Sequence, residues 1–179
     1  MAHCHWSCVL GIAVLLSAGG SLRADQDDVR KMQRACAAAR ISLTQAIEIA
    51  EREVAGGRAV DVELEWKRNG PRIEVELVVA DAWKEVHIDA VTGKVLKVQD
   101  EPADDREDQE ELKRDKENLQ AATIGFGEAI AQAEKEAGGK VVEVELTSSA
   151  GQPAYKLKLL VNDKLVTRRV RAVKDDPQP

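Results

Sequence analysis

The chain has 179 residues, of which 32% are charged and only 3% are aromatic, and its formal net charge is −6. Any core must therefore be built mainly from valine, leucine, isoleucine and alanine, and the length allows one domain or two small ones. The acidic balance argues against a nucleic-acid-binding protein, which needs a concentrated basic face.

The first 24 residues have the pattern of an export signal. An apolar run from Val9 to Leu16 is followed by small residues at 17–20, and the run is too short to span a bilayer as a mature helix. Cleavage after Ala24 or near Gly20 would fit this pattern. We therefore predict a signal peptide at residues 1–24 and a periplasmic or secreted protein with no stable membrane span after its removal.

Removal of the signal would also remove most of the metal-ligand-like residues of the chain. Imidazole and thiolate are the usual zinc donors, but no metal site is predicted, because export would discard His3, Cys4, His5 and Cys8. Neither of these cysteines has the small-residue surroundings of a lipid-anchor site. The remaining Cys36 has no partner for an internal disulfide, so it would stay free or pair between chains.

One pattern occurs twice along the chain. The segment ISLTQAIEIAEREVAGGRAVDVELEW (residues 41–66) matches IGFGEAIAQAEKEAGGKVVEVELTS (residues 124–148), with a one-residue deletion before the paired glycines. Such ordered self-similarity indicates a duplicated structural unit. We predict two similar modules, at residues 41–99 and 123–175, joined by a linker at residues 100–122.

Each module is expected to begin with one amphipathic helix and to continue with antiparallel strands. Apolar residues recur at helical spacing from Leu43 to Val54 and from Phe126 to Ala137, and Ser42 with Gln45 has the form of a capping box. The period then changes to two, which is typical of strands with one buried face. We predict strands at residues 60–66, 73–79, 83–89 and 95–99 in the first module and at residues 141–147, 155–161 and 165–173 in the second. The fold class is therefore α+β, with each helix packed on a three- to four-stranded antiparallel sheet.

The linker carries the charge imbalance of the whole chain. From Asp100 to Glu117 it has ten acidic and four basic residues, and it has almost no apolar face to bury. We expect a solvated, partly helical tether. A calcium site is not predicted here, because the run lacks the loop spacing that gathers several oxygens around one ion.

With helix, hairpin and turns in place, each module resembles the PepSY domain, a family found in the propeptides of thermolysin-like metallopeptidases and in many small exported bacterial proteins. The resemblance rests on the repeat segment, on the strand RIEVELVV, and on the closing segment HIDAVTGKVLKV, which contains Asp89, Gly93 and Lys94. The second module keeps the helix and the first strands but ends in RVRAVKDD in place of that closing segment.

The resemblance implies a non-enzymatic binding module that inhibits or regulates a peptidase in the cell envelope. A peptidase or another envelope protein is then the expected partner. The alternative is a ligand or cation sensor that uses an acidic sheet face. Capture of a peptidase from envelope extract would favour the first function, and calcium-dependent melting without a protein partner would favour the second.

The residues give little support for an enzyme. His87 is the one histidine that remains after signal removal, and its counterpart in the second module is Arg169, so the repeat does not require an imidazole. The strand carboxylates are expected on a wet face, where they stay ionised. We predict no catalytic residue and no cofactor, and a structural role for His87.

The two modules differ in the charges of their outward strand positions. Like charges face each other across the first hairpin, which destabilises it: they are Asp61, Glu63, Glu65, Glu74 and Glu76. In the second module Lys156 and Lys158 replace the last two glutamates and can pair with Glu143 and Glu145. Its third strand is basic through Arg168, Arg169 and Arg171. We predict that the acidic face binds a basic partner, either this arginine strand or another protein, the alternative being a merely solvated surface.

A free sheet edge is a second candidate interface. An antiparallel sheet with an open edge can accept an extended segment of a partner. The sequence does not indicate which edge is open.

Overall fold

The structure is a computed structural model that describes residues 21–174, with side chains from residue 26 onward. Most of the predicted export signal lies outside the described residues. The histidines and cysteines at positions 3, 4, 5 and 8 also lie outside them.

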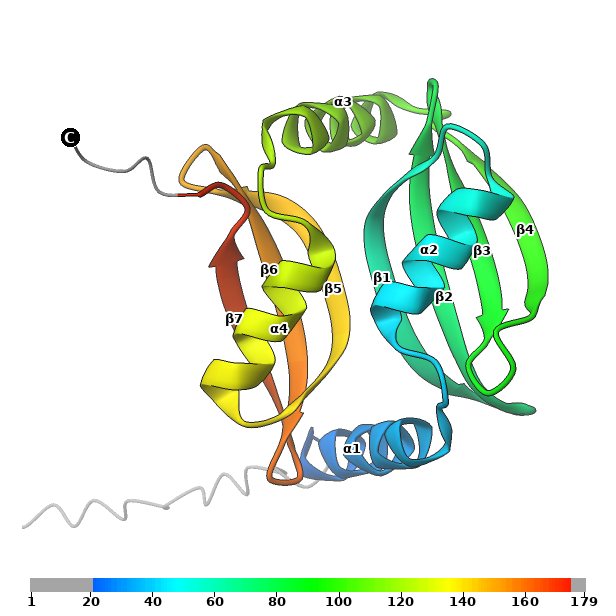
Figure 1. Ribbon diagram of the computed structural model, residues 1–179, viewed down its shortest axis with the longest axis vertical. Coiled ribbons are helices and arrows are strands. Elements are labelled where there is room, and N and C mark those ends of the chain that lie inside the picture. Colours follow the sequence, from blue (N-terminus) through cyan, green and yellow to red (C-terminus); the bar gives the residue numbers. More distant parts are fainter. Residues whose placement is uncertain (1–20, 175–179) are drawn as a thin grey trace, which may run out of the picture.

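The strands of residues 21–174 form one continuous antiparallel sheet of seven strands, in the order β4-β3-β2-β1-β5-β6-β7 (Figure 1). The α+β class and the two-module layout are confirmed. The expectation of a separate small sheet in each module is corrected, because the two sheets are joined edge to edge. The first module contributes β1 (Arg58–Lys67), β2 (Gly70–Val79), β3 (Ala82–Asp89) and β4 (Val95–Pro102), and the second contributes β5 (Lys140–Ser149), β6 (Gln152–Val161) and β7 (Lys164–Arg171).

The join between the modules is a short pairing of β1 with β5. It consists of the pairs Asp61 with Glu145, Val62 with Val144, and Glu63 with Glu143. Without it, each strand would be an open edge with unpaired backbone groups, so the pairing provides partners for both strands over these three residues. Val62 and Val144 are fully buried, and the join therefore also makes the two hydrophobic cores continuous.

Four helices accompany the sheet within the described residues. They are α1 (Ser21–Ala38), α2 (Leu43–Glu53), α3 (Arg106–Ala121) and α4 (Phe126–Ala137). The repeat helices α2 and α4 each pack on the strands of their own module (Figure 1). The predicted capping box of α2 is confirmed: Ser42 Oγ accepts from Gln45 N at 3.1 Å, and Gln45 Oε1 accepts from Ser42 N at 2.8 Å. Gly138 ends α4 with a left-handed φ of 67°.

The main core lies on the sheet face that carries α1, α2 and α4, which we call the helix face. Helix α1, which lies before the repeat and was not predicted, adds Met32 and Ala35 to this core and contacts strands of both modules. Its Cys36 is half-buried and forms no disulfide with any described residue. The side chains that are completely buried include Val62, Val75, Leu77, Val86, Ile88, Val144, Leu157 and Leu159.

Helix α3 lies in the linker and packs on the opposite face of the sheet, which we call the polar face. Asp105 caps the start of α3, and Leu112 is buried against Val60, Val78 and Trp83 in a second, smaller apolar cluster. The linker was expected to be a solvated, partly helical tether. Residues 106–121 do form a helix, but this helix packs on the sheet, because Leu112 and Leu119 place two apolar side chains on one side of it.

Candidate functional site

The five acidic residues predicted to bind a partner lie together on the polar face. β1 carries Asp61, Glu63 and Glu65, and β2 carries Glu74 and Glu76. The register sets Asp61 opposite Glu76 and Glu63 opposite Glu74. The structure thus brings these carboxylates together, and their role in partner binding stays a prediction.

The predicted arginine strand lies at the far edge of the sheet. Arg168, Arg169 and Arg171 belong to β7, and both β5 and β6 separate this strand from β1. Within one chain, these arginines therefore do not cover the acidic face. The strand of the second module that lies beside the acidic strand is β5.

Four carboxylates meet where β1 pairs with β5. Asp61 is opposite Glu145, and Glu63 is opposite Glu143. The glutamates of β5 have the lysine partners that the sequence predicted: Lys156 Nζ lies 2.6 Å from Glu145 Oε2, and Lys158 is bonded to Glu143. Among the described residues, no hydrogen-bond or ion-pair partner holds the Asp61 carboxyl group.

The Asp61 carboxyl group is buried among other carboxylates, which raises its pKa to about 8. Burial contributes most to this rise, and the neighbouring carboxylates of Glu143 and Glu76 come next. Burial, with Glu101 and Asp115 next, raises the pKa of Glu76 to about 7. Burial also raises the pKa of Glu63. Near neutral pH this part of the polar face therefore holds protons that ordinary surface carboxylates would lose.

The other end of the acidic face is neutralised by its own module. Arg72 lies on the same face of β2 and is bonded to Glu74. The distance from Arg72 Nη2 to Glu65 Oε2 is 3.4 Å. Lys67 is bonded to Glu65 and lies 3.5 Å from Glu74 Oε1. The like-charge conflict predicted for the hairpin is thus relieved at Glu65 and Glu74 but persists between Asp61 and Glu76.

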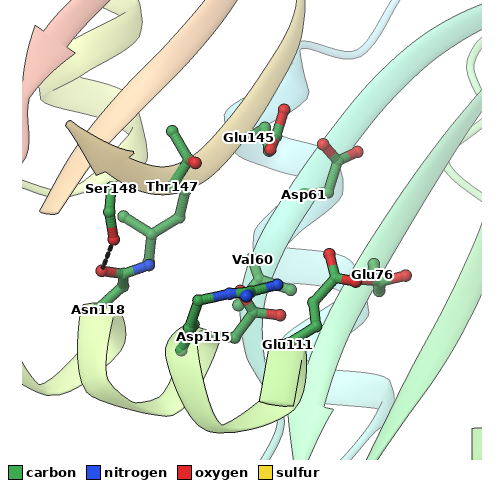
Figure 2. A pocket seen from close by; sticks show the side chains of 11 residues that line it. Val60, Asp61, Glu76, Glu111, Asp115, Asn118, Glu145, Thr147 and Ser148 are labelled. Atoms are coloured by element: carbon green, nitrogen blue, oxygen red, sulfur yellow. Dashed lines mark hydrogen bonds between the residues drawn. The ribbon is translucent and has the colours of Figure 1, made fainter. Parts of the chain in front are cut away.

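A cavity of about 540 Å³ lies between this unrelieved part of the polar face and α3 (Figure 2). We call it the junction pocket, because strands of both modules and the linker helix line it. At one end, Asn118 of α3 accepts a hydrogen bond of 2.9 Å from the Ser148 hydroxyl of β5. The lining residues are Val60, Asp61, Glu76, Glu111, Arg114, Asp115, Asn118, Glu145, Leu146, Thr147 and Ser148.

The charge of the junction pocket is mostly negative. Arg114 is the single basic side chain among its lining residues. Trp83 Nε1 donates a 2.9 Å hydrogen bond to Asp115 Oδ2 and fixes this carboxylate in place, while burial raises its pKa. A pocket of this kind can accept protons or a cationic group, because either one offsets the repulsion between its carboxylates.

The linker residues of the pocket were missed in the sequence. Glu111, Arg114 and Asp115 looked like part of a solvated charge run, and their place in the pocket depends on α3 folding back over the sheet. The signal that could have found them is the pair Leu112 and Leu119, whose spacing marks one side of the helix as buried.

His87 belongs to a separate polar cluster on the same face of the first module. Ligand atoms of Glu74, Glu85 and His87 lie within 4.8 Å of one another. However, Arg72 Nη1 lies 3.2 Å from His87 Nδ1, and the guanidinium is also bonded to Glu74. Because an arginine can only donate, His87 accepts at Nδ1 and donates from Nε2 to Glu85. A permanent cation already occupies the middle of this cluster, so we propose no metal there.

The fold defines the chain as two modules, each with one repeat helix on an antiparallel sheet, fused through their first strands. Residues 40–99 and 123–170 match the family described as PepSY, peptidase propeptide and YPEB domain. These stretches cover more than half of the chain, and the chain belongs to the PepSY family. The resemblance seen in the sequence is thus confirmed in both copies.

A solved structure supports the same assignment. A protein from Clostridium difficile 630, described as a "putative lipoprotein", is 28% identical in sequence, with a TM-score of 0.51, and the match covers 76% of this chain and 89% of that chain. None of the curated proteins matches the chain. No helix among the described residues is long and apolar enough to cross a membrane.

Proposed function

We propose that this protein is an exported, non-enzymatic binding module that regulates a peptidase of the cell envelope, and that the junction pocket holds a basic segment of that partner. Membership of a family named for peptidase propeptides supports the general role. The observation that carries the proposal is the pairing of Asp61 with Glu145 and Glu76 in a pocket with one basic lining residue.

The carboxylates of the pocket favour a basic side chain over a neutral one. Asp61 and Glu76 hold their protons to a higher pH than ordinary carboxylates because they are buried and because other carboxylates surround them. A lysine or arginine of a partner would offset this repulsion and allow both groups to ionise. Binding would then release protons, and it would weaken as salt screens the charges at the rim of the pocket.

The test is capture of partners from envelope extract of the source organism, followed by binding assays with the purified partner. We expect a peptidase among the captured proteins at low salt. The double variant Asp61→Asn with Glu76→Gln keeps the shapes of both side chains but removes the carboxylates. It should weaken binding of the peptidase about tenfold or more, as loss of buried charge pairs does at interfaces.

The matched control is Glu107→Gln with Glu110→Gln, which removes two carboxylates from the exposed side of α3. This control should bind the peptidase like the wild type. Loss of binding in the pocket variant is not expected to reflect unfolding, because the substitutions remove like-charge repulsion. Capture of no peptidase would overturn the regulatory role, and equal binding by the pocket variant would overturn the assignment of the pocket.

The alternative function, a cation sensor, would use the same carboxylates, since calcium prefers oxygen ligands. It predicts that calcium raises the melting temperature of the protein in the absence of any partner. The pocket variant would abolish this rise. Capture of a peptidase together with calcium-independent melting would exclude the sensor.

A further inference from the structure

Within residues 21–174, the seven-stranded sheet has two outer strands, β4 and β7, each with a neighbouring strand on one side only. β3 flanks β4 and β6 flanks β7. The outward backbone N–H and C=O groups of an outer strand can pair with a further strand. The two outer strands are therefore places where the sheet could be extended.

The outer strand β7 is basic. Lys164, Arg168 and Arg169 are exposed, and neither Arg168 nor Arg169 forms an ion pair with any residue among 26–174. Arg169 lies opposite Lys156 of β6, so two like charges are adjacent on the polar face. An acidic strand beside β7 would relieve this repulsion.

The outer strand β4 begins with exposed apolar residues and ends with acidic ones. Leu96 is 54% exposed and Val98 is 40% exposed, and with Val91 they are the large apolar side chains that the described residues leave exposed. Asp100 and Glu101 follow before the strand ends at Pro102. Asp100 is bonded to Lys84 of β3, but its side chain remains 77% exposed, and Glu101 shares a hydrogen bond with Glu85 of β3. Among residues 26–174, the exposed large apolar side chains thus lie on β4 or in the turn that precedes it.

Strand direction decides how these two edges could meet. All six neighbouring pairs in the sheet are antiparallel, so the first and seventh strands of the order, β4 and β7, run in the same direction. A second copy moved sideways in the plane of the sheet would place its β4 beside β7 as a parallel pair. The helix faces of the two copies would then lie on the same side.

The side chains of the two edges match in one such register. Val98 lies opposite Val86, and Val166 lies opposite Leu159, so both valines belong to the helix face. When these valines are side by side, Asp100 is next to Arg168 on the helix face, and Glu101 is next to Arg169 on the polar face.

We propose that the protein associates with itself through this edge, with β7 of one copy pairing in parallel with β4 of the next. Apolar side chains meet at Val98 and Val166, and two acid–base pairs form beside them. A symmetric pairing of two β7 strands would instead bring arginines together. The contact is heterologous, so it leaves one free edge at each end and chains of copies can grow with concentration.

The test uses two variants that each reverse the charge of one edge. Arg168→Glu with Arg169→Glu changes β7, and Asp100→Arg with Glu101→Arg changes β4. The weight-average mass of the purified wild-type protein should rise with concentration in sedimentation experiments at low salt. Each variant alone should associate about tenfold more weakly, because two favourable pairs become repulsive.

An equal mixture of the two variants should associate again, because every contact between unlike variants is complementary in charge. This rescue also shows that both variants are folded. The matched control is Arg52→Glu with Lys135→Glu. It makes the same charge change as the β7 variant, but at exposed positions of α2 and α4, and it should associate like the wild type.

Three results would overturn the proposal. The first is a wild-type protein that remains monomeric at all concentrations, even if β7 binds an acidic peptide from another protein. The second is association of the β7 variant alone as strong as that of the wild type, which would indicate pairing of two β4 strands. The third is association of the β4 variant alone as strong as that of the wild type, which would indicate pairing of two β7 strands.

Discussion

The two modules share a scaffold but differ in how they treat charge on the polar face. In the second module, the glutamates of β5 face Lys158 and Lys156 on β6. In the first module, Asp61 faces Glu76 at the equivalent place. Both hairpins fold, because both pack their alternate residues on a repeat helix. The comparison teaches that burial on the helix face fixes the scaffold, whereas the polar face is free to carry an arrangement that costs stability.

The largest expected effect on stability comes from shortening equivalent side chains in the core that the modules share. Leu77 on β2 and Leu159 on β6 are equivalent and fully buried. Leu77→Ala and Leu159→Ala should each lower the free energy of unfolding by about 2–5 kcal/mol. Because sheet and core are continuous, we expect one cooperative transition in urea for both variants, followed by circular dichroism and tryptophan fluorescence. Different midpoints from the two probes would show that the modules unfold independently.

The next largest effect is the dependence of stability on pH. The raised pKa of Asp61, about 8 against an ordinary 3.8, means that the folded chain binds more protons than the unfolded chain between these values. The free energy of unfolding should therefore fall as pH rises, with the stabilisation fully present below about pH 4 and lost above about pH 8. Glu76 acts in the same direction up to about pH 7.

Urea denaturation between about pH 5 and pH 8.5 measures this loss, which we expect to be about 4 kcal/mol from Asp61 alone. Asp61→Asn should flatten the curve and leave the protein more stable than the wild type at the alkaline end. Glu110→Gln on the exposed side of α3 is the control and should follow the wild-type curve. Stability that rises with pH over this range would show that Asp61 and Glu76 are already ionised in the folded chain.

Gly57 and Gly139 are equivalent in the two modules, but the space around them differs. An alanine Cβ at position 139 would lie 2.6 Å from Leu160 O, whereas at position 57 the nearest atom is Val54 O at 3.0 Å. Gly139→Ala should therefore lower the free energy of unfolding by about 1–3 kcal/mol, and Gly57→Ala by less. Thermal melting of the two variants side by side measures the difference. Equal losses would contradict the closer approach at Gly139.

The smallest expected effect comes from giving the first module the charge arrangement of the second. Glu76→Lys places a cation opposite Asp61, as Lys158 is placed opposite Glu143. The pKa of Asp61 should fall, the pH dependence should weaken, and stability at about pH 8 should rise by about 0.5–1 kcal/mol. Melting curves at several pH values measure all three, with Glu48→Lys at an exposed site of α2 as the control. An unchanged pH dependence would mean that Glu76 does not influence Asp61.

The two repeat helices and most strands could be predicted because their signals are local. The capping box at Ser42 and the alternation along β1 and β2 depend on neighbouring residues alone. The pairs of Lys156 with Glu145 and Lys158 with Glu143 followed from the hairpin register. In each case a few residues of sequence contain the full physical cause.

The join between modules and the junction pocket could not be predicted in the same way. A period of two marks Val62 and Val144 as buried, but it does not indicate which strand lies beside β1. Arg72 was missed as a partner of Glu74, although both lie on one face of β2. The place of Asp115 in the pocket depends on tertiary folding of the linker, which its many charges concealed.

The pairing of β1 with β5 also sets an order of events during folding. The chain is synthesised from its N-terminus, so the strands of the first module end at Pro102 well before β5 begins at Lys140. During that interval β1 has an open edge beside a nearly complete core. Pairing with β5 closes this edge in the folded chain and so removes a place where β1 of another chain could pair. The linker thus connects β5 to the strand that it must pair with, in addition to lining the junction pocket.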